Sequence, residues 1–317
     1  MVEKLSLGID GTMSNTEKIL VLGGTGHYGR HIVKALIENK QKVRVLSRNM
    51  TKAREIIGEE PEILEGDITS NETVINALQG VSAIIICVSA FNKKNIRKFK
   101  LIERDSVLIV LYEAEKIGIK RIVYISVYGK PDVNVDISQG RIKREIEDKL
   151  EQTSFNYTIL GAPPSMEIFF SMIRKGKMTV PGGGPPALPT IAPIDLGKIA
   201  AQTVVRSDLN RKRFSLVGSD VISFREAADR ISKVTGKEIG FRKVPLFPIK
   251  VAALITGVLR PFFPYISQLL KFIILMNTAF TSEMVEQAFD HQRLLQETFD
   301  YQPLTLEEFT MKYYNLK

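Results

Sequence analysis

Residues 19–30 read Ile-Leu-Val-Leu-Gly-Gly-Thr-Gly-His-Tyr-Gly-Arg, a short apolar run followed by glycines at 23, 24, 26 and 29. Beyond them, apolar residues recur at the spacing of one helix face, at 32, 33, 36 and 37. This order predicts a buried strand, a glycine turn and a helix. Such a turn favours a dinucleotide ligand, because backbone amides and the positive end of the helix face the pyrophosphate.

Each glycine of this turn has its own expected task. Gly23 permits the tight turn, Gly26 lets backbone amides approach the pyrophosphate, and Gly29 brings the helix close to the strand. A glycine-rich turn without a ligand is the alternative, but the position between a strand and a helix favours the dinucleotide. Three further residues of the turn are expected to contact the cofactor: Thr25, His27 and Tyr28.

The length of 317 residues allows one large or two modest domains with a sizeable core. Apolar content of 44% and charged content of 25% are typical of a soluble globular protein. The single cysteine, Cys87, allows no disulfide framework, and the three scattered histidines form no metal-ligand pattern. We therefore expect no metal ion.

The net charge of +9 favours an anionic partner, such as a phosphorylated cofactor, an anionic membrane or a nucleic acid. Part of the excess falls in one short segment, residues 93–104. This segment is interpreted as a solvated helix face, since no nucleic-acid motif surrounds it, and no nucleic-acid partner is expected. Its basic residues are Lys93, Lys94, Arg97, Lys98, Lys100 and Arg104.

The chain divides into three expected parts. Residues 1–16 carry no apolar segment like that of a signal peptide, so we expect a flexible tail and a cytoplasmic protein. Residues 17–165 are expected to form the dinucleotide-binding domain, and residues 166–317 a smaller, mostly helical region that covers the substrate. Within the latter, residues 189–218 are expected to return to the sheet.

The residue that decides between the two nicotinamide cofactors follows the second expected strand, residues 42–46. An NAD-preferring fold carries an acidic residue about 20 positions beyond the glycines. Here Arg48 occupies that region, and Lys52 follows one helical turn later. A guanidinium pairs well with the 2′-phosphate of NADP, so we expect NADP(H) to be preferred over NAD(H). A surface arginine that starts a helix is the alternative.

Further strand-like segments alternate with helix-like segments, the longest at 102–116. This alternation predicts an α/β fold of the Rossmann type, with a doubly wound parallel sheet. The expected strands lie at 62–64, 83–88 and 121–126.

Ligands bind such sheets in the crevice at the carboxyl ends of the strands. Val88 and Ser89 end the fourth strand and are therefore expected beside the cofactor. Asp67 follows the third strand, where it either reaches the adenine or caps the helix that starts near Asn71.

The sequence resembles the atypical short-chain dehydrogenase/reductase superfamily, close to its NmrA-like and isoflavone-reductase-like branches. The resemblance covers nearly the whole chain, but it is specific only in the nucleotide-binding half. It implies a Rossmann fold, a nicotinamide cofactor, and either hydride transfer or redox sensing. The motifs that carry it are the glycine turn, Ser47-Arg48 with Lys52, Gly66-Asp67, and residues 120–126, 156–160, 214–217, 235–237 and 304–309.

The catalytic segment departs from the pattern of the dehydrogenase members, which carry a tyrosine four residues before a lysine. Here Gln139 stands four residues before Lys143. Lys143 instead resembles the lysine of the isoflavone-reductase-like branch, which implies binding of the nicotinamide ribose, electrostatic stabilisation or proton transfer. An exposed helix lysine paired with Glu147 is the alternative. We expect Lys143→Ala to leave stability nearly unchanged, as surface substitutions do.

Ser126 is the second catalytic candidate. It ends the fifth strand, where relatives place a polar active-site group, although a serine can also simply terminate a strand.

A second departure follows the sixth strand, where relatives commonly have Arg-Pro and this chain has Gly-Ala-Pro-Pro at 161–164. The missing arginine leaves open how the nicotinamide side is closed. Ala162 and Pro163 are expected beside the cofactor. Three residues that follow suit an apolar planar substrate, and core packing explains them equally well: Met166, Phe169 and Phe170.

Residues 246–276 are strongly apolar, and each half, 249–259 and 262–276, is shorter than the roughly 20 residues of a spanning helix. Helices that cover the substrate pocket are the first interpretation. Peripheral membrane contact through two amphipathic helices is the alternative, and the basic balance favours it. Five residues interrupt the apolar run: Lys250, Arg260, Pro261, Pro264 and Lys271.

The leading functional interpretation is an NADP(H)-dependent reductase that transfers hydride to a small apolar substrate with a carbonyl or an unsaturated bond. Gln139 in place of the tyrosine favours a rival, a non-catalytic redox sensor that binds NADP and reports to a regulatory protein partner. A membrane-peripheral assembly factor is a third interpretation. The fold does not choose among them, because function belongs to the site.

Overall fold

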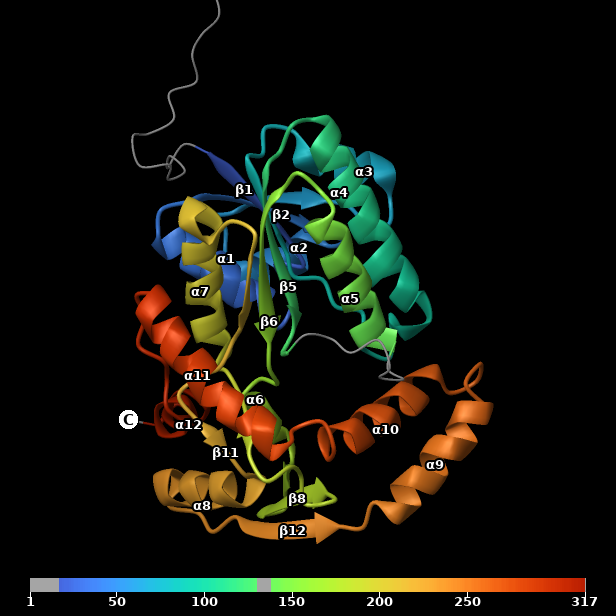
Figure 1. Cartoon of the computed structure of the whole chain (residues 1–317), viewed down its shortest axis with the longest axis vertical. Coiled ribbons are helices and arrows are strands. Elements are labelled where there is room, and N and C mark those ends of the chain that lie inside the picture. The colour runs from blue at the N-terminus through green and yellow to red at the C-terminus, as the bar shows by residue number, and fades with distance from the viewer. Residues whose placement is uncertain (1–16, 130–137, 317) are drawn as a thin grey trace, which may run out of the picture.

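A seven-stranded sheet forms the centre of the molecule, and every hydrogen-bonded pair of neighbouring strands in it is parallel (Figure 1). The computed structural model describes residues 17–129 and 138–316, so the expected tail at 1–16 lies outside the described residues. In sheet order, the strands are β10 (Lys212–Ser215), β6 (Asn156–Ala162), β5 (Arg121–Val127), β4 (Ala83–Ile86), β1 (Lys18–Leu22), β2 (Lys42–Ser47) and β3 (Glu62–Glu65).

Helices cover both faces of this sheet, which confirms the predicted doubly wound α/β fold of the Rossmann type. The strands are apolar almost without alternation, as expected for a sheet buried on both sides. On one face lie α1 (Gly29–Glu38) and α7 (Pro193–Val205). On the other lie α3 (Asn71–Leu78), α4 (Ser106–Lys116) and α5 (Ser138–Glu151). Helix α2 (Met50–Ile57) connects β2 to β3.

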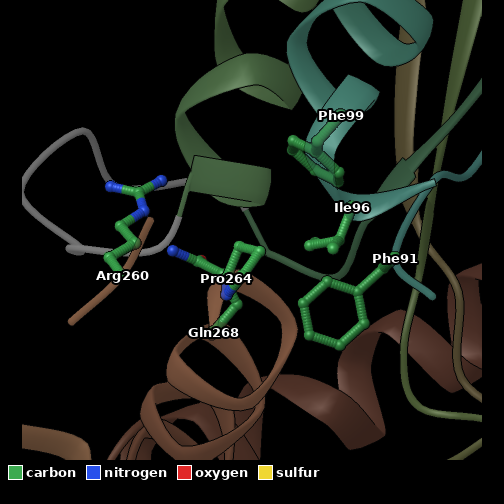
Figure 2. Close-up of a pocket in the computed structure, with 6 residues that line it drawn as sticks. All are labelled: Phe91, Ile96, Phe99, Arg260, Pro264 and Gln268. Atoms are coloured by element: carbon green, nitrogen blue, oxygen red, sulfur yellow. The ribbon is translucent and has the colours of Figure 1, made fainter. Parts of the chain in front are cut away.

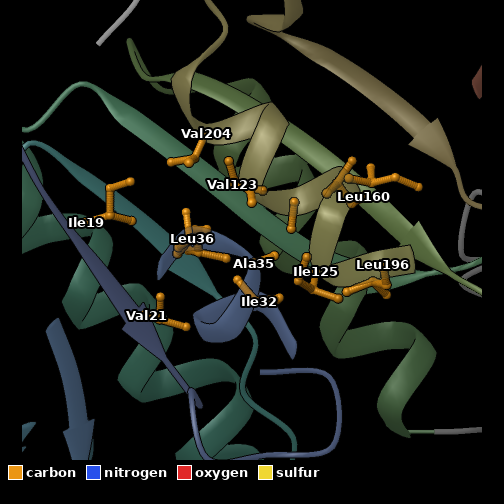
Figure 3. Packing of buried hydrophobic residues seen from close by; sticks show 14 of the residues in the cluster. Ile19, Val21, Ile32, Ala35, Leu36, Val123, Ile125, Leu160, Leu196 and Val204 are labelled. Carbon is orange, nitrogen blue, oxygen red and sulfur yellow. The ribbon is translucent and has the colours of Figure 1, made fainter. Parts of the chain in front are cut away.

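After β6 the chain returns to the sheet with α7 and β10, and apolar packing beneath α1 and α7 stabilises this return. Figure 3 shows Ile32 and Leu36 of α1 and Leu196 of α7 meeting strand side chains in one buried cluster. The two helices cross closely at Gly197, where a Cβ atom would lie 2.4 Å from the carbonyl oxygen of His31. After α7 the chain enters β10, which pairs with β6 at the edge of the sheet.

The C-terminal region lies beyond the carboxyl ends of the strands (Figure 1) and has its own apolar core. It also holds two small sheets, in the orders β12-β8-β7 and β11-β9. Its elements are α6 (Glu167–Ser171), β7 (Ile173–Arg174), β8 (Lys177–Pro181), β9 (Leu188–Pro189), β11 (Val221–Ile222), α8 (Phe224–Thr235), β12 (Gly240–Val244), α9 (Phe247–Val258), α10 (Pro264–Met276), α11 (Ser282–Thr298) and α12 (Leu306–Tyr313).

The expected helix at 102–116 is present but begins differently. A π-helical turn, η2 (Leu101–Asp105), leads directly into α4, and two short 3-10 turns occur at η1 (Ile96–Lys98) and η3 (Ser207–Leu209). Such π-helical turns are rare and are often found at functional sites.

The apolar segment 246–276 forms two helices, α9 and α10, as the sequence predicts. Helix α10 packs on η1, while α9 has α10 as its main neighbour. That the two helices cover a substrate pocket stays a prediction. Over residues 17–129 and 138–316, no helix combines the length and the apolarity needed to cross a bilayer.

Asp195, in the first turn of α7, is fully buried and joins the two regions. Its Oδ2 accepts a hydrogen bond of 2.8 Å from the backbone N–H of Leu304, just before α12. Burial raises the pKa of Asp195 to about 6. The folded protein therefore takes up a proton more readily than the unfolded chain between pH ~4 and ~6, and stability falls as the pH rises through that window.

Asp195→Asn is expected to stabilise the protein by about 1–2 kcal/mol near neutral pH, because the amide oxygen still accepts from Leu304 without a buried charge. Urea denaturation at several pH values measures the effect. The gain should shrink to nothing below pH ~4, where Asp195 is protonated in both states. A destabilisation that is constant with pH would contradict this account.

Candidate functional site

The glycine turn between β1 and α1 can be built only from glycine at two positions. Gly23 has a positive φ of 84°, and a Cβ atom there would lie 2.4 Å from the carbonyl oxygen of Cys87. A Cβ atom on Gly29 would lie 2.0 Å from the carbonyl oxygen of Gly23. Gly26 is exposed, and its N–H donates to that same oxygen at 2.9 Å. The turn thus presses the start of α1 against the end of β1 and leaves its outer side open.

The N-terminus of α1 has no side-chain cap. The N-cap residue is Tyr28, whose side chain forms no capping hydrogen bond, and the first turn holds no acidic residue. The N–H groups of Arg30 and His31 donate to the carbonyl oxygens of Gly26 and Tyr28, at 3.2 and 3.0 Å, and the positive end of the helix attracts an anion. This geometry fits a pyrophosphate.

Side chains of the turn tie it to the end of β6. The hydroxyl of Tyr28 donates to the carbonyl oxygen of Pro163 at 3.0 Å, and burial raises the pKa of this tyrosine. Nδ1 of the exposed His27 lies 3.4 Å from Oε2 of Glu167 on α6. Partial burial lowers the pKa of His27; Glu167 opposes this shift, and the nearby Arg30 adds to it. Thr25 is half-buried between the glycines.

Arg48 follows β2 directly, and both Arg48 and Lys52 are exposed. Neither side chain forms an ion pair with a residue in the described ranges. Helix α2 begins at Met50, and its N-cap is Asn49, whose Oδ1 accepts from the N–H of Lys52 at 2.8 Å. Arg48 is thus an exposed residue directly before the N-cap, which the surface-arginine alternative also fits, and its contact with a 2′-phosphate stays a prediction. Both cations are available to an anionic ligand.

The register of strand pairing places the carboxyl ends of β2, β1, β4 and β5 side by side along one edge of the sheet. Leu22 pairs with Leu46 of β2 and with Ile86 of β4, and Ile86 in turn pairs with Tyr124 of β5. The residues that follow these positions therefore share one edge of the sheet. The glycine turn, Arg48, and the residues around Val88 and Ser126 all lie there.

Asp67 holds the turn that follows β3. Its Oδ1 accepts hydrogen bonds from the N–H and from the hydroxyl of Thr69, at 3.0 and 2.9 Å. The N-cap of α3 is Ser70, so the proposed cap of that helix by Asp67 is wrong. The carboxylate is half-buried, and its contact with an adenine stays a prediction.

Lys143 lies on α5 with only 5% of its surface exposed. Its Nζ donates to the carbonyl oxygens of Val88, two residues beyond β4, and of Ile125 in β5, both at 3.3 Å. Nζ also lies 3.6 Å from Oε2 of Glu103 and 4.9 Å from the centre of the Tyr124 ring. The alternative of an exposed lysine paired with Glu147 is therefore wrong.

The surroundings of Lys143 keep it charged. Burial by itself lowers its pKa, but Tyr124, Glu103 and Cys87 together hold the pKa above its usual value. Burial raises the pKa values of Tyr124 and Cys87 to about 12, so both stay protonated at neutral pH. Near neutral pH the partner of the ammonium is thus the carboxylate of Glu103.

Glu103 is the residue of this site that the sequence interpretation missed. It lies in η2, is 1% exposed, and its Oε1 accepts from the N–H of Ala90 at 2.6 Å. A signal existed, because Glu103 stands four residues before Val107 and seven before Val110, on the buried face of the helix. A carboxylate on an apolar helix face indicates a buried cation as its partner.

Ser126 belongs to a second buried network. Its hydroxyl donates to Oε1 of Glu147, a fully buried carboxylate on α5. Nε of Arg213 on β10 donates to Oε2 of Glu147 at 3.0 Å. A second Arg213 nitrogen donates to the carbonyl oxygen of Val127, also at 3.0 Å. This network joins β5, α5 and β10, while a catalytic role for Ser126 stays a prediction.

The other expected contacts are distributed along the strand ends. Val88 and Ala162 are half-buried, Ser89 is exposed, and Pro163 is buried beneath Tyr28. The three expected substrate residues lie in the core of the C-terminal region, where Phe169 packs edge-on against Phe224. Met166 and Phe169 are 0% exposed and Phe170 5%, which favours the core-packing alternative. Their contact with a substrate stays a prediction.

A small cavity of about 30 Å³ lies between the segment after β4 and helix α10 (Figure 2). Figure 2 shows Phe91, Ile96 and Phe99 on one side and Pro264 and Gln268 of α10 on the other. This volume holds about one or two water molecules, so the cavity is too small for a substrate. The cavity lies where α10 packs against the segment that follows β4.

Two curated relatives carry different functions in their names. The chain is 24% identical over 311 residues to the photosystem II assembly factor Ycf39 of Trieres chinensis. The aligned region covers 93% of this chain and 92% of that protein. It is 25% identical to an NAD(P)H azoreductase of Xenophilus azovorans, over 77% of this chain and 82% of that protein.

Solved structures with the same fold include reductases with bound cofactor. One is the NADPH-dependent quinone oxidoreductase QOR2 of Escherichia coli complexed with NADPH, with a TM-score of 0.72 and 18% identity, covering 94% of this chain and 100% of that one. Another is the triphenylmethane reductase of Citrobacter sp. complexed with NADP(H), with a TM-score of 0.68 and 20% identity. The match covers 93% of this chain and 99% of that one. The model of the NmrA-like family matches residues 15–310, nearly the whole chain, and the protein therefore belongs to the NmrA-like family.

Proposed function

We propose that this protein binds NADP(H) along the carboxyl edge of the sheet and uses it to reduce a small apolar substrate. The observation that carries the proposal is the alignment of three features on that edge. A helix N-terminus without a side-chain cap follows β1, the exposed cations Arg48 and Lys52 follow β2, and the charged Lys143 lies near the ends of β4 and β5.

Each feature suits one part of the dinucleotide. The open side of the glycine turn, around Gly26, would receive the pyrophosphate on backbone amides. Arg48 would pair with the 2′-phosphate through its planar fork, with Lys52 as a second cation. Lys143 lies two strands away from Arg48, on the side where the nicotinamide half would extend.

The bound cofactor would supply the hydride. Lys143 would supply a fixed positive charge near the atom that becomes negative in the transition state. Its raised pKa makes it a poor general base near neutral pH, because the ammonium form dominates. Glu103, itself held by the N–H of Ala90, would keep that ammonium in place.

The names of three similar proteins and the apolar C-terminal region favour an apolar, conjugated substrate. The names of an azoreductase, a quinone oxidoreductase and a triphenylmethane reductase describe reduction of apolar, conjugated molecules. The apolar C-terminal region over the strand ends suits such a molecule, with a carbonyl or an unsaturated bond.

A second candidate function is a non-catalytic NADP sensor or an assembly factor that acts through a protein partner. Gln139 stands where dehydrogenase relatives carry their tyrosine, and the relative Ycf39 is named an assembly factor. An amide cannot donate and recover a proton as a phenol can. Such a protein would bind NADPH without oxidising it.

Cofactor choice tests the proposal first. NADPH is expected to bind more tightly than NADH, and Arg48→Glu should narrow or invert that difference. Loss of a charge-assisted phosphate contact amounts to about 1.5–3 kcal/mol, roughly 10- to 150-fold in Kd. Calorimetric titration of both cofactors into both proteins measures it.

Lys149→Glu is the matched control, because it reverses an exposed charge on α5 far from the expected phosphate. It should leave both affinities unchanged. Equal affinities for NADPH and NADH in the parent protein would refute the assignment of NADP(H).

A further inference from the structure

Helix α9 carries a stripe of large apolar side chains that face solvent. Three of them are the most exposed, Phe247 at 75%, Leu254 at 72% and Val258 at 78%. Val251 and Ile255 complete the stripe, with spacings of three and four residues along the helix. Such a stripe is the pattern of a helix face that packs against a core.

No core of the described residues covers this face. Ala253 is the one buried residue of α9, and the main described neighbour of the helix is α10 (Figure 1). The link to α10 extends the apolar surface, with Phe262 73% and Phe263 45% exposed. Monomeric soluble proteins rarely expose contiguous apolar surface of this kind without a binding role.

Basic residues surround the stripe. Residues 247–276 contain no aspartate or glutamate, and the exposed Lys250 and Arg260 flank the apolar face. The basic segment before η2 adjoins it, because the guanidinium of Arg97 donates to the carbonyl oxygen of Pro261 at 3.2 Å. Four more exposed cations lie in that segment: Lys93, Lys94, Lys98 and Lys100.

This combination decides between the possible occupants. A second copy would bring two basic segments together, and like charges repel. An anionic bilayer accepts apolar side chains between its lipids and attracts lysine and arginine at its surface. Helices α9 and α10 have 12 and 13 residues, shorter than the roughly 20 needed to span, so they would lie in the plane of the surface.

We propose that α9 and the link to α10 form a docking surface for an anionic lipid bilayer. The apolar stripe enters the headgroup layer, and Lys250 and the cations of residues 93–100 contact the lipid phosphates. This proposal does not depend on the reductase activity, because it uses none of the residues assigned to the cofactor.

Flotation of the full-length protein with lipid vesicles tests the proposal. The protein should float with vesicles of phosphatidylcholine and phosphatidylglycerol, and weakly with vesicles of phosphatidylcholine alone. The double variant Leu254→Gln/Val258→Gln removes two apolar anchors and should weaken the partition coefficient roughly a hundredfold. Both side chains face solvent, so the thermal midpoint of unfolding should stay the same.

Tyr112→Gln on α4 is the matched control, since this side chain is 62% exposed on a helix elsewhere and should not alter binding. Lys250→Gln should weaken binding on the order of fivefold, and added salt should weaken it further.

Three results would overturn the proposal. They are equal flotation of the double variant and the parent, equal flotation with neutral and anionic vesicles, or an absence of flotation. Light scattering run beside the vesicle assay identifies the rival occupant. A parent dimer that Leu254→Gln/Val258→Gln makes monomeric, without flotation, would assign this surface to a second copy.

Discussion

Lys143→Met is expected to destabilise the protein by about 3–5 kcal/mol, because it leaves the carboxylate of Glu103 buried without its cation. This result replaces the expectation that Lys143 behaves like a surface residue. Since its pKa is raised in the folded state, its stabilising contribution is complete below pH ~10 and is lost as the pH rises through the folded value. Urea denaturation of parent and variant measures the difference.

A second substitution separates stability from chemistry. In Lys143→Met/Glu103→Gln both charges are gone, while the amide oxygen still accepts from the N–H of Ala90. Most of the lost stability should return, because no unpaired charge remains buried. The rate of substrate reduction should stay roughly a hundredfold or more below the parent, as expected when one electrostatic contribution is lost.

Lys149→Met, an exposed lysine on the same helix, serves as the control and should change neither quantity. A double variant that regains the parent's reduction rate together with its stability would assign Lys143 a structural role alone.

Gly29→Ala is expected to weaken cofactor binding strongly while leaving a weakened fold. The new Cβ atom would lie 2.0 Å from the carbonyl oxygen of Gly23, and both partners are backbone, so α1 must move away from β1. Overpacking of this kind destabilises by on the order of 3 kcal/mol. The displaced helix N-terminus should lower NADPH affinity by roughly a hundredfold or more, since a misplaced site loses its amide contacts.

Gly140→Ala on α5 is the matched control, because a Cβ atom there meets nothing within 4 Å. It should stabilise the helix slightly, by up to about 1 kcal/mol, and leave NADPH binding unchanged. Fluorescence titration with NADPH and thermal unfolding of both variants provide the comparison. If Gly29→Ala bound NADPH as tightly as the parent protein, the glycine turn would not be part of the binding site.

The sequence was sufficient for the parallel sheet because its signals are local. The glycine turn, the apolar strands and the alternation with helices each lie within a short window, so β1 to β5 fall close to their predicted ranges. The 17-residue helix α11 had no such signal, because polar residues occupy most of its positions and few of its residues are buried. Its place depends on contacts with β9 and β10, which lie far away in the chain.

The site was predicted less completely, because its partners are distant in sequence. Lys143 and Glu103 are 40 residues apart, and Glu147 and Arg213 are 66 apart. Helical spacing suggested that Lys143 would pair with Glu147. In the structure Lys143 instead donates to the carbonyl oxygen of Ile125, while Glu147 accepts from the hydroxyl of Ser126, so the two side chains belong to different networks. The stripe on α9 shows the converse limit, since a periodic pattern indicates an apolar face but not what covers it.

Single-turnover oxidation of bound NADPH tests the central claim most directly. The protein is loaded with NADPH, mixed with each member of a panel of quinones, enones and aldehydes, and followed by the absorbance of the reduced nicotinamide. The account predicts that at least one acceptor oxidises the bound cofactor, and that the Lys143→Met/Glu103→Gln variant does so roughly a hundredfold more slowly. Tight NADPH binding without oxidation by any member of the panel would contradict the reductase and favour the sensor.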